Sequence, residues 1–193
     1  MIITKAMEAE GEMKDQIMEA IKQRRSVRNF EDKPVSEELI RKVLESVQWS
    51  PSWANTQCWE VVVITDPAVK AQVQEAVPKA NPAHKSMVNA PVVLALCARR
   101  NTSGYYKESV TTKYGDWFMF DLGIAAQSIC LAAHAAGLGT VIAGLFEHDK
   151  AAEALKVPEG YDLVSLIPMG YPAKVPNAPK RRDISEFAHE NIF

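Results

Sequence analysis

The sequence has few cysteines, and their spacing matches no known motif. Cys58, Cys97 and Cys130 are the only three in 193 residues, and no C-x-x-C pair occurs. That pattern argues against a zinc site or a dithiol redox motif, and it favours reduced thiols in a cytoplasmic protein. The four histidines are also scattered, without ligand-like spacing. We therefore expect no metal site.

Long apolar runs and an excess of positive charge are missing as well. We find no run of the ~18 apolar residues that a membrane span needs, and the start, MIITKAMEAEGEMKD, lacks the apolar core of a signal peptide. Lysine and arginine number 22 against 24 aspartates and glutamates, so the net charge is −2. Proteins that bind nucleic acid usually carry a basic excess. The sequence thus predicts a soluble, cytoplasmic protein that binds neither nucleic acid nor a membrane.

The common catalytic motifs do not occur. There is no H-E-x-x-H, no G-x-S-x-G and no G-x-x-x-x-G-K-[ST]. A G-x-G begins at Gly137, but it closes a predicted helix instead of opening one, so it is not a dinucleotide fingerprint. No acid–base pair stands out. If the chain is an enzyme, we expect a cofactor to supply the chemistry and no side chain to act as the catalytic group.

What is present is an ordinary globular composition, with 47% hydrophobic and 24% charged residues. We expect a single domain over residues 1–193, in which residues 1–14 are frayed and residues 173–193 form a tail with too few apolar residues to fold alone. Periodicity predicts helices ending near residue 24, then at 36–50, from 67, at 116–139 and at 149–157. β-Branched runs predict buried strands at 59–66 and 91–98, a strand or an extended segment at 140–146 and a last strand at 162–172, with a mobile loop at 101–114. Interleaved helices and few strands indicate an α+β fold, a mixed sheet flanked by helices.

Three arginines in RRSVRNF form the first candidate site. Guanidinium groups bind phosphate oxygens in a bidentate way and stay charged, and a serine hydroxyl adds a donor. Arg24, Arg25, Ser26 and Arg28 therefore suit a phosphate. Cations at the C-terminus of a helix also interact favourably with its dipole, so simple capping explains the cluster equally well.

Three further stretches are weaker candidates when taken alone. PSWANTQ places Ser52, Asn55 and Gln57 on a tight loop, where they could read a flat polar heterocycle or form a plain turn. The small residues of Ile142–Gly144 allow a flat ligand to approach the backbone closely. Arg181 and Arg182 lie in a proline-rich tail and could bind an anion or be a solvated basic run.

The order of these motifs along the chain is more specific than any one of them. RRSVRNF follows an N-terminal helix, SPSWANTQ precedes a strand, D-x-G-x-A-x-Q-S lies in the long helix, GLGTVIAGLF follows it, and MGYP and a basic tail close the chain. This order resembles the FMN-dependent nitroreductase family from about Ile17 to the C-terminus.

The resemblance implies a three-layer α/β/α fold and an intertwined homodimer with FMN at its interface, the tail packing on the partner subunit. NADH or NADPH would donate a hydride, and a flat acceptor such as a nitroaromatic, quinone or enone would take the electrons in a ping-pong cycle. It also implies which residues contact FMN. The phosphate and the pyrimidine edge would be held by Arg24, Arg25, Ser26 and Arg28, and Arg181 or Arg182 would close on the phosphate. The loop of the partner subunit would supply Pro51, Ser52, Asn55 and Gln57. The ring would be lined by Ile142, Ala143, Gly144 and Leu145.

The sequence departs from the family pattern at Cys58, where the family usually has proline, and at the bulky Trp53. Residues 101–114 are also short where longer members carry an insertion, so the substrate is poorly constrained. Two alternatives stay open: a flavin-binding carrier or sensor without turnover, and a specialised relative that dehalogenates, destroys flavin or dehydrogenates peptides.

Overall fold

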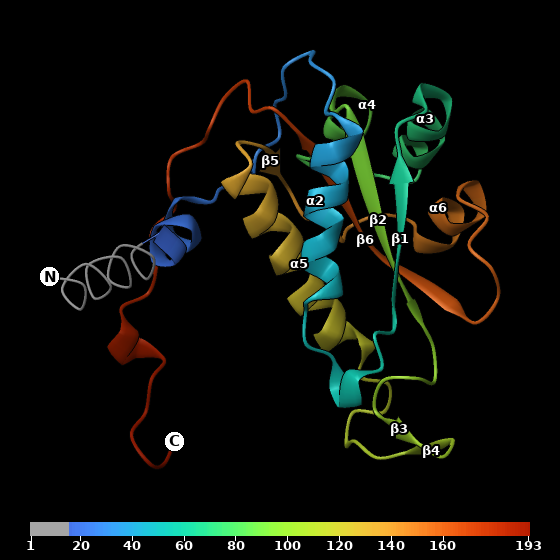
Figure 1. Cartoon of the computed structure of the whole chain (residues 1–193), viewed down its shortest axis with the longest axis vertical. Helices are drawn as coiled ribbons and strands as arrows, with labels where there is room; N and C mark the ends of the chain where they lie inside the picture. Colours follow the sequence, from blue (N-terminus) through green and yellow to red (C-terminus); the bar gives the residue numbers. More distant parts are fainter. Residues whose placement is uncertain (1–15) are drawn as a thin grey trace, which may run out of the picture.

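The computed structural model describes residues 16–193 and is built around a four-stranded sheet (Figure 1). Its strands lie in the order β1 (Trp59–Ile64), β2 (Val92–Arg99), β6 (Tyr161–Gly170) and β5 (Gly139–Thr140), and each neighbouring pair is antiparallel. The four strands thus form an antiparallel sheet, and an isolated parallel bridge outside them joins Ser26 to Thr140 of β5. The frayed start predicted for residues 1–14 lies outside the described residues.

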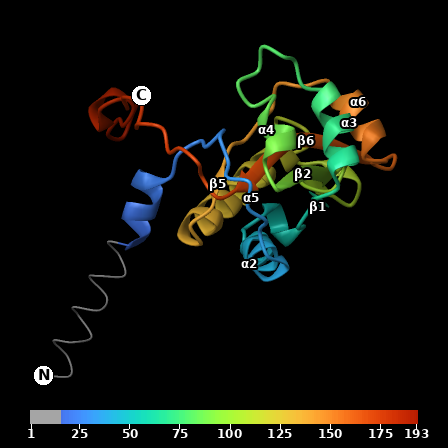
Figure 2. The same ribbon diagram turned by 90° about the horizontal axis from the view of Figure 1, so that it is seen from above.

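Helices cover both faces of this sheet. One face carries α2 (Glu37–Gln48) and α5 (Phe118–Ala135), and the other carries α3 (Pro67–Glu75), α4 (Ser86–Asn89) and α6 (His148–Ala154), as Figures 1 and 2 show. A further helix at residues 16–23 projects from the body. The arrangement confirms the α/β/α layering that the resemblance implies.

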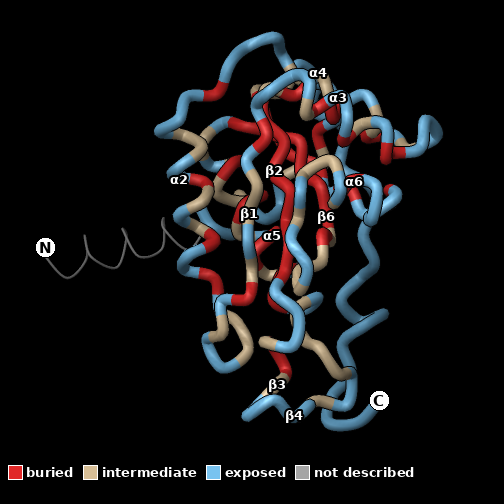
Figure 3. The backbone as a smooth tube through the Cα atoms, turned by 90° about the vertical axis from the view of Figure 1, so that its right-hand side faces the viewer, coloured by how far each residue is buried: buried red, intermediate tan, exposed pale blue. Residues whose placement is uncertain are grey.

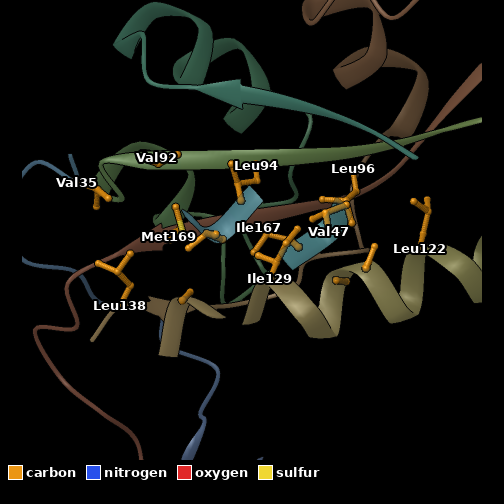
Figure 4. Close-up of a cluster of buried hydrophobic side chains, with 14 of the residues drawn as sticks. Val35, Val47, Val92, Leu94, Leu96, Leu122, Ile129, Leu138, Ile167 and Met169 are labelled. Atoms are coloured by element: carbon orange, nitrogen blue, oxygen red, sulfur yellow. The ribbon is translucent and has the colours of Figure 1, made fainter. Parts of the chain in front are cut away.

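The core lies on both faces of β2, a strand that is buried along most of its length (Figure 3). Successive strand side chains point to opposite faces. Leu94 and Leu96 accordingly pack toward α2 and α5, while Val93 and Ala95 belong to the cluster under α3 and α6. Figure 4 shows the first cluster, in which Ile129 of α5 faces the sheet.

Helix α2 forms where the sequence predicted a helix, because a capping serine and an acidic first turn mark its start. The Ser36 hydroxyl caps the helix by accepting a hydrogen bond from the Leu39 N–H at 3.3 Å, and Glu37 and Glu38 lie in the first turn, where the dipole favours negative charge. Val43 and Val47 of its apolar stripe are buried against the core.

α5 is the helix of the described residues that is long and apolar enough, by length and composition, to cross a membrane. We had expected no such run, but small residues fill the helix, and its acidic and basic residues are Asp121 in the first turn and His134 in the last. In the structure α5 packs beneath the sheet, burying Leu122, Ile129 and Ala133. It ends four residues before the predicted boundary, because Gly137 adopts a left-handed φ of 77°.

Two other segments differ from their prediction. β1 lies at the sheet edge and only Ile64 is buried, because β2 is its one neighbour in the sheet. Residues 101–114 contain a small hairpin, β3 (Tyr105–Tyr106) and β4 (Ser109–Val110), where we had expected an irregular loop. Its turn residues, Lys107 and Glu108, both have positive φ, which matches the twist that two-residue hairpin turns require.

Candidate functional site

The arginine-rich segment lies along the β5 edge of the sheet. Val27 donates its backbone N–H to the Thr140 carbonyl at 2.8 Å, and Phe30 forms an antiparallel bridge with Pro172. Because these contacts fix the backbone on both sides of Arg28, the positions of the three arginines follow from the edge of the sheet.

A pair of glycines makes this docking possible. Gly139 and Gly170 face each other across β5 and β6. A Cβ on Gly139 would lie 2.7 Å from Val27 Cβ, and a Cβ on Gly170 would lie 2.5 Å from Pro91 and 3.2 Å from Phe30. We had assigned Gly139 only to ending the long helix; its close packing against Val27 appears only in the tertiary structure.

The docked arginines have different surroundings. Arg25 donates to the carbonyls of Lys22 and Arg24 at the end of helix 16–23, which is the capping arrangement. Both Arg24 and Arg25 line a hollow of about 200 Å³ beside the C-terminal end of α5, together with Cys130, His134 and Gly137–Thr140. Within residues 16–193 the Arg24 side chain makes no hydrogen bond or ion pair, so its charge is available to an anion. The Arg28 side chain is exposed, and it donates to the Ser26 carbonyl at 3.3 Å.

Residues 142–145 continue from the same edge. Ala143 exchanges two hydrogen bonds with Leu166, at 2.8 and 3.0 Å, and is buried. Ile142 and Leu145 are therefore turned outward, with exposed fractions of 47% and 67%. Open space lies where a Cβ on Gly144 would point. The structure thus brings this apolar segment next to the arginines, as a phosphate-bearing flat ligand requires.

Residues 81–86, which the sequence analysis did not connect with the site, join the arginine segment to residues 142–145. The Asn81 side-chain amide donates to the Leu145 carbonyl at 2.8 Å, and the Ser86 hydroxyl donates to the Arg28 carbonyl at 3.0 Å. The Asn-Pro dipeptide at Asn81 signals a turn, but nothing in the sequence indicates which segments that turn contacts.

The loop Pro51–Gln57 lies elsewhere in the chain. Ala54, Asn55 and Gln57 all have positive φ, between 46° and 55°. The Ser52 hydroxyl accepts the Gln57 N–H at 2.9 Å, and the Gln57 amide donates to Asn55 at 3.3 Å. The loop contacts Asp121 near the start of α5, whereas Arg24 lies beside His134 near its end, about 20 Å away along the axis. A single chain therefore leaves the loop and the arginines at opposite ends of α5 (Figure 1).

Asp121 is the first residue of the D-x-G-x-A-x-Q-S motif, but the sequence analysis gave it no role of its own. Its buried carboxylate accepts hydrogen bonds from the Trp53 N–H at 3.0 Å, the Ser103 hydroxyl at 2.7 Å and the Cys58 thiol at 3.6 Å. Burial, and then the nearby Asp121 charge, raise the pKa of Cys58 to about 12. The thiol is therefore protonated at neutral pH, where it serves as a hydrogen-bond donor and not as a nucleophile.

The tail leaves the body beside the arginine segment, where Ala173 donates to the Asn29 carbonyl at 3.0 Å. Beyond that point residues 173–193 are exposed. Arg182 pairs with Glu186 of the short 3-10 helix Ile184–Glu186, with 3.7 Å between Nε and Oε2. Neither Arg181 nor Arg182 is brought to the hollow beside Arg24.

The residues at the β5 edge fit FMN in kind. Arg24 offers a cation that has no partner among residues 16–193, the hollow leaves room beside it, and the outward-facing residues of 142–145 offer an apolar surface for a ring. Phosphate binding by guanidinium and stacking on apolar residues use this combination of groups.

The fold and this edge site define an α+β protein with a place for a flat, phosphate-bearing ligand. The family model described as Nitroreductase family matches residues 21–171, and the chain belongs to that family. A protein of Methanothermobacter thermautotrophicus named as an NADH dehydrogenase/NAD(P)H nitroreductase is 33% identical over 164 residues, covering 83% of this chain and 79% of that protein.

Two more similar proteins extend the comparison. The FMN reductase [NAD(P)H] of Bacillus subtilis is 27% identical over 181 residues, covering 86% of this chain and 71% of that protein. The solved structure of an FMN-dependent nitroreductase from Clostridium difficile R20291 superposes with a TM-score of 0.74 at 25% identity, covering 91% of this chain and 99% of that one.

Proposed function

We propose that the protein is an FMN-dependent NAD(P)H oxidoreductase that reduces a flat, electron-poor acceptor such as a nitroaromatic, a quinone or an enone. The observation that carries this proposal is the placement, on one edge of the sheet, of the outward-facing apolar residues of 142–145 and of Arg24, which has no hydrogen bond or ion pair within residues 16–193 and lines a hollow. The names of the relatives from Bacillus subtilis and Clostridium difficile support FMN as the cofactor and NADH or NADPH as the donor.

Each residue of the edge then has a role in holding the cofactor. Arg24 and Ser26 bind the phosphate, and residues 142–145 cover one side of the ring. Arg28 places a positive charge beside the pyrimidine edge, where negative charge develops during reduction. When bound, FMN would supply the redox chemistry at N5 for a ping-pong cycle between NADH or NADPH and the acceptor. No side chain acts as a general base in this scheme.

A homodimer completes the site in this proposal. The loop with Pro51, Ser52, Asn55 and Gln57 faces the flavin of the other subunit, and Arg181 or Arg182 closes on a phosphate as the tail packs on the partner. The exposed apolar residues of helix 16–23 and of the tail support such an interface, since soluble surfaces seldom leave so many uncovered. We also place the protein in the cytoplasm, where its three free, buried thiols would stay reduced.

The test is the absorbance spectrum of the purified protein, with the chromophore released and identified. We expect bound FMN, and oxidation of NADH or NADPH when a quinone or nitroaromatic is added. A protein that cannot be reconstituted with FMN would refute the proposal, and a yellow protein that oxidises neither nucleotide would support the carrier or sensor alternative.

A further inference from the structure

We infer that Asp121 is a positioning residue that holds the loop Pro51–Gln57 in the conformation in which it contacts flavin. The inference rests on the proposed function, because it concerns the way that loop serves the flavin site of the partner subunit. Asp121 does not touch the cofactor; it acts through the backbone of the loop.

The first argument is the set of hydrogen bonds around the loop. Within the described part of the chain, the Trp53 N–H to Asp121 is the hydrogen bond that ties residues 52–57 to the rest of the protein. The other hydrogen bonds of the loop, between Ser52 and Gln57, Asn55 and Gln57, Ser52 and Asn55, and Trp53 and Thr56, stay inside it. The position of the loop on the body therefore depends strongly on one carboxylate oxygen.

The second argument is the strain of the loop backbone. Ala54, Asn55 and Gln57 are not glycine, yet each has φ near +50°. Residues hold such conformations only where surrounding contacts fix them, and strain of this kind gathers at functional sites. Without its hydrogen bond to Asp121, we expect the loop to relax and to misplace Ser52, Asn55 and Gln57.

The third argument is the way the carboxylate itself is held. Asp121 is 1% exposed and lies in the first turn of α5, where the helix dipole stabilises negative charge. The Ser103 hydroxyl and the Cys58 thiol donate to its other oxygen, Oδ2, so that Oδ1 is free to accept the Trp53 N–H. Two donors and a rigid helix thus fix the acceptor before the loop binds to it.

A matched pair of variants isolates this hydrogen bond. Trp53→Ala removes the indole but keeps the backbone N–H, whereas Trp53→Pro removes both. Proline suits this position, because Trp53 opens a 3-10 helix and Ser52 before it is extended, with φ −137° and ψ 161°. We expect Trp53→Pro to bind FMN at least tenfold more weakly than Trp53→Ala, at similar melting temperatures of the two apo proteins. Equal FMN affinities would overturn the inference.

A second pair tests the same contact from the carboxylate side. Asp121→Asn keeps an oxygen acceptor for the Trp53 N–H, and its amide can donate to Ser103. We expect it to bind FMN within about threefold of the parent, while Asp121→Ala loses tenfold or more. Ser103→Ala removes one of the two donors that hold the carboxylate but leaves Oδ1 as the acceptor for Trp53, so its loss of FMN affinity should be smaller than that of Asp121→Ala. If Ser103→Ala weakens FMN binding as much as Asp121→Ala, the hydrogen bond to Trp53 is not what matters and the inference is wrong.

Mixed dimers then test whether the loop acts on the partner's site. Consider a heterodimer of one Arg24→Ala subunit and one Asp121→Ala subunit. If each site combines Arg24 of one subunit with the loop of the other, one site carries both defects and the other carries none. We expect half of its sites to bind FMN with the affinity of the parent. Two weakened sites would overturn the role across the interface. If the parent itself binds no FMN, the proposed function fails, and that outcome is distinct from equal binding by Trp53→Pro and Trp53→Ala.

Discussion

At the scale of single residues, the arginine cluster combines two roles that the sequence could not separate. Phosphate binding and helix capping both explain RRSVR, and the structure gives two of the arginines different surroundings. Both Arg24 and Arg25 line the hollow, but Arg25 donates to helix carbonyls, whereas Arg24 makes no hydrogen bond or ion pair within residues 16–193. A guanidinium already bonded to carbonyls has fewer donors left for a ligand, so the two side chains should differ in their effect on FMN.

We predict that Arg24→Ala weakens FMN binding by about ten- to a hundredfold, because a charge-assisted contact is worth roughly 1.5–3 kcal/mol. Riboflavin lacks the phosphate and should bind the variant and the parent almost equally. Arg25→Ala should show a smaller FMN-selective loss. Titration of the apo protein with both flavins at fixed salt measures these effects, and an unchanged FMN affinity in Arg24→Ala would remove that residue from the phosphate site.

At the scale of elements, the site depends on how segment 24–30 docks on β5 and β6. Val27 packs on Gly139 and Phe30 approaches Gly170. Because glycine has no side chain, these two positions of the sheet leave room for the side chains of Val27 and Phe30. The same edge continues into residues 142–145, and Asn81 and Ser86 tie it to a third segment. A change in how segment 24–30 docks on the sheet should therefore displace both the arginines and residues 142–145.

Gly139→Ala should disturb this docking. Its new Cβ would lie 2.7 Å from Val27 Cβ, so the segment must shift, and overpacking of this kind costs about 1–3 kcal/mol. We expect a lower urea midpoint and weaker FMN binding. The double variant Val27→Gly/Gly139→Ala restores the space and should recover part of the FMN affinity. No recovery would show that the contact with Val27 does not set the position of the arginines.

At the scale of the whole molecule, helix 16–23 and the tail 173–193 leave apolar residues exposed in a single chain. Helix 16–23 exposes Ile17 and Ile21, and the tail exposes Ile184 and Phe187, with exposed fractions between 44% and 70%. Both ends leave the body from the same side of the sheet (Figures 1 and 2). Apolar surface of this kind is stabilised when a second subunit covers it.

We predict an obligate homodimer. Sedimentation at micromolar concentration should show one dimeric species, and removal of residues 173–193 should yield monomer and lower the FMN content, because the tail cannot bury its apolar residues on its own chain. A stable monomer that carries stoichiometric FMN would contradict this prediction.

The sequence determined much of the fold and the family. Ser36 and the stripe of α2, the β-branched runs of β1 and β2, and the apolar length of α5 are local patterns, so they predict elements directly. The nitroreductase resemblance and the three-layer fold are confirmed. The individual site residues stay predictions, although Arg24, Ser26 and residues 142–145 do lie together on one edge.

Only the tertiary structure decided which residues position the site. The packing of Val27 on Gly139 joins residues 112 positions apart, and the hydrogen bond of Trp53 to Asp121 joins residues 68 apart. Propensity and periodicity describe neighbours along the chain, whereas these contacts depend on how the sheet edge and α5 meet other segments in space. The sequence therefore predicted the elements and the candidate ligand-binding residues, and the packing of distant segments determined which glycines and which buried carboxylate place them.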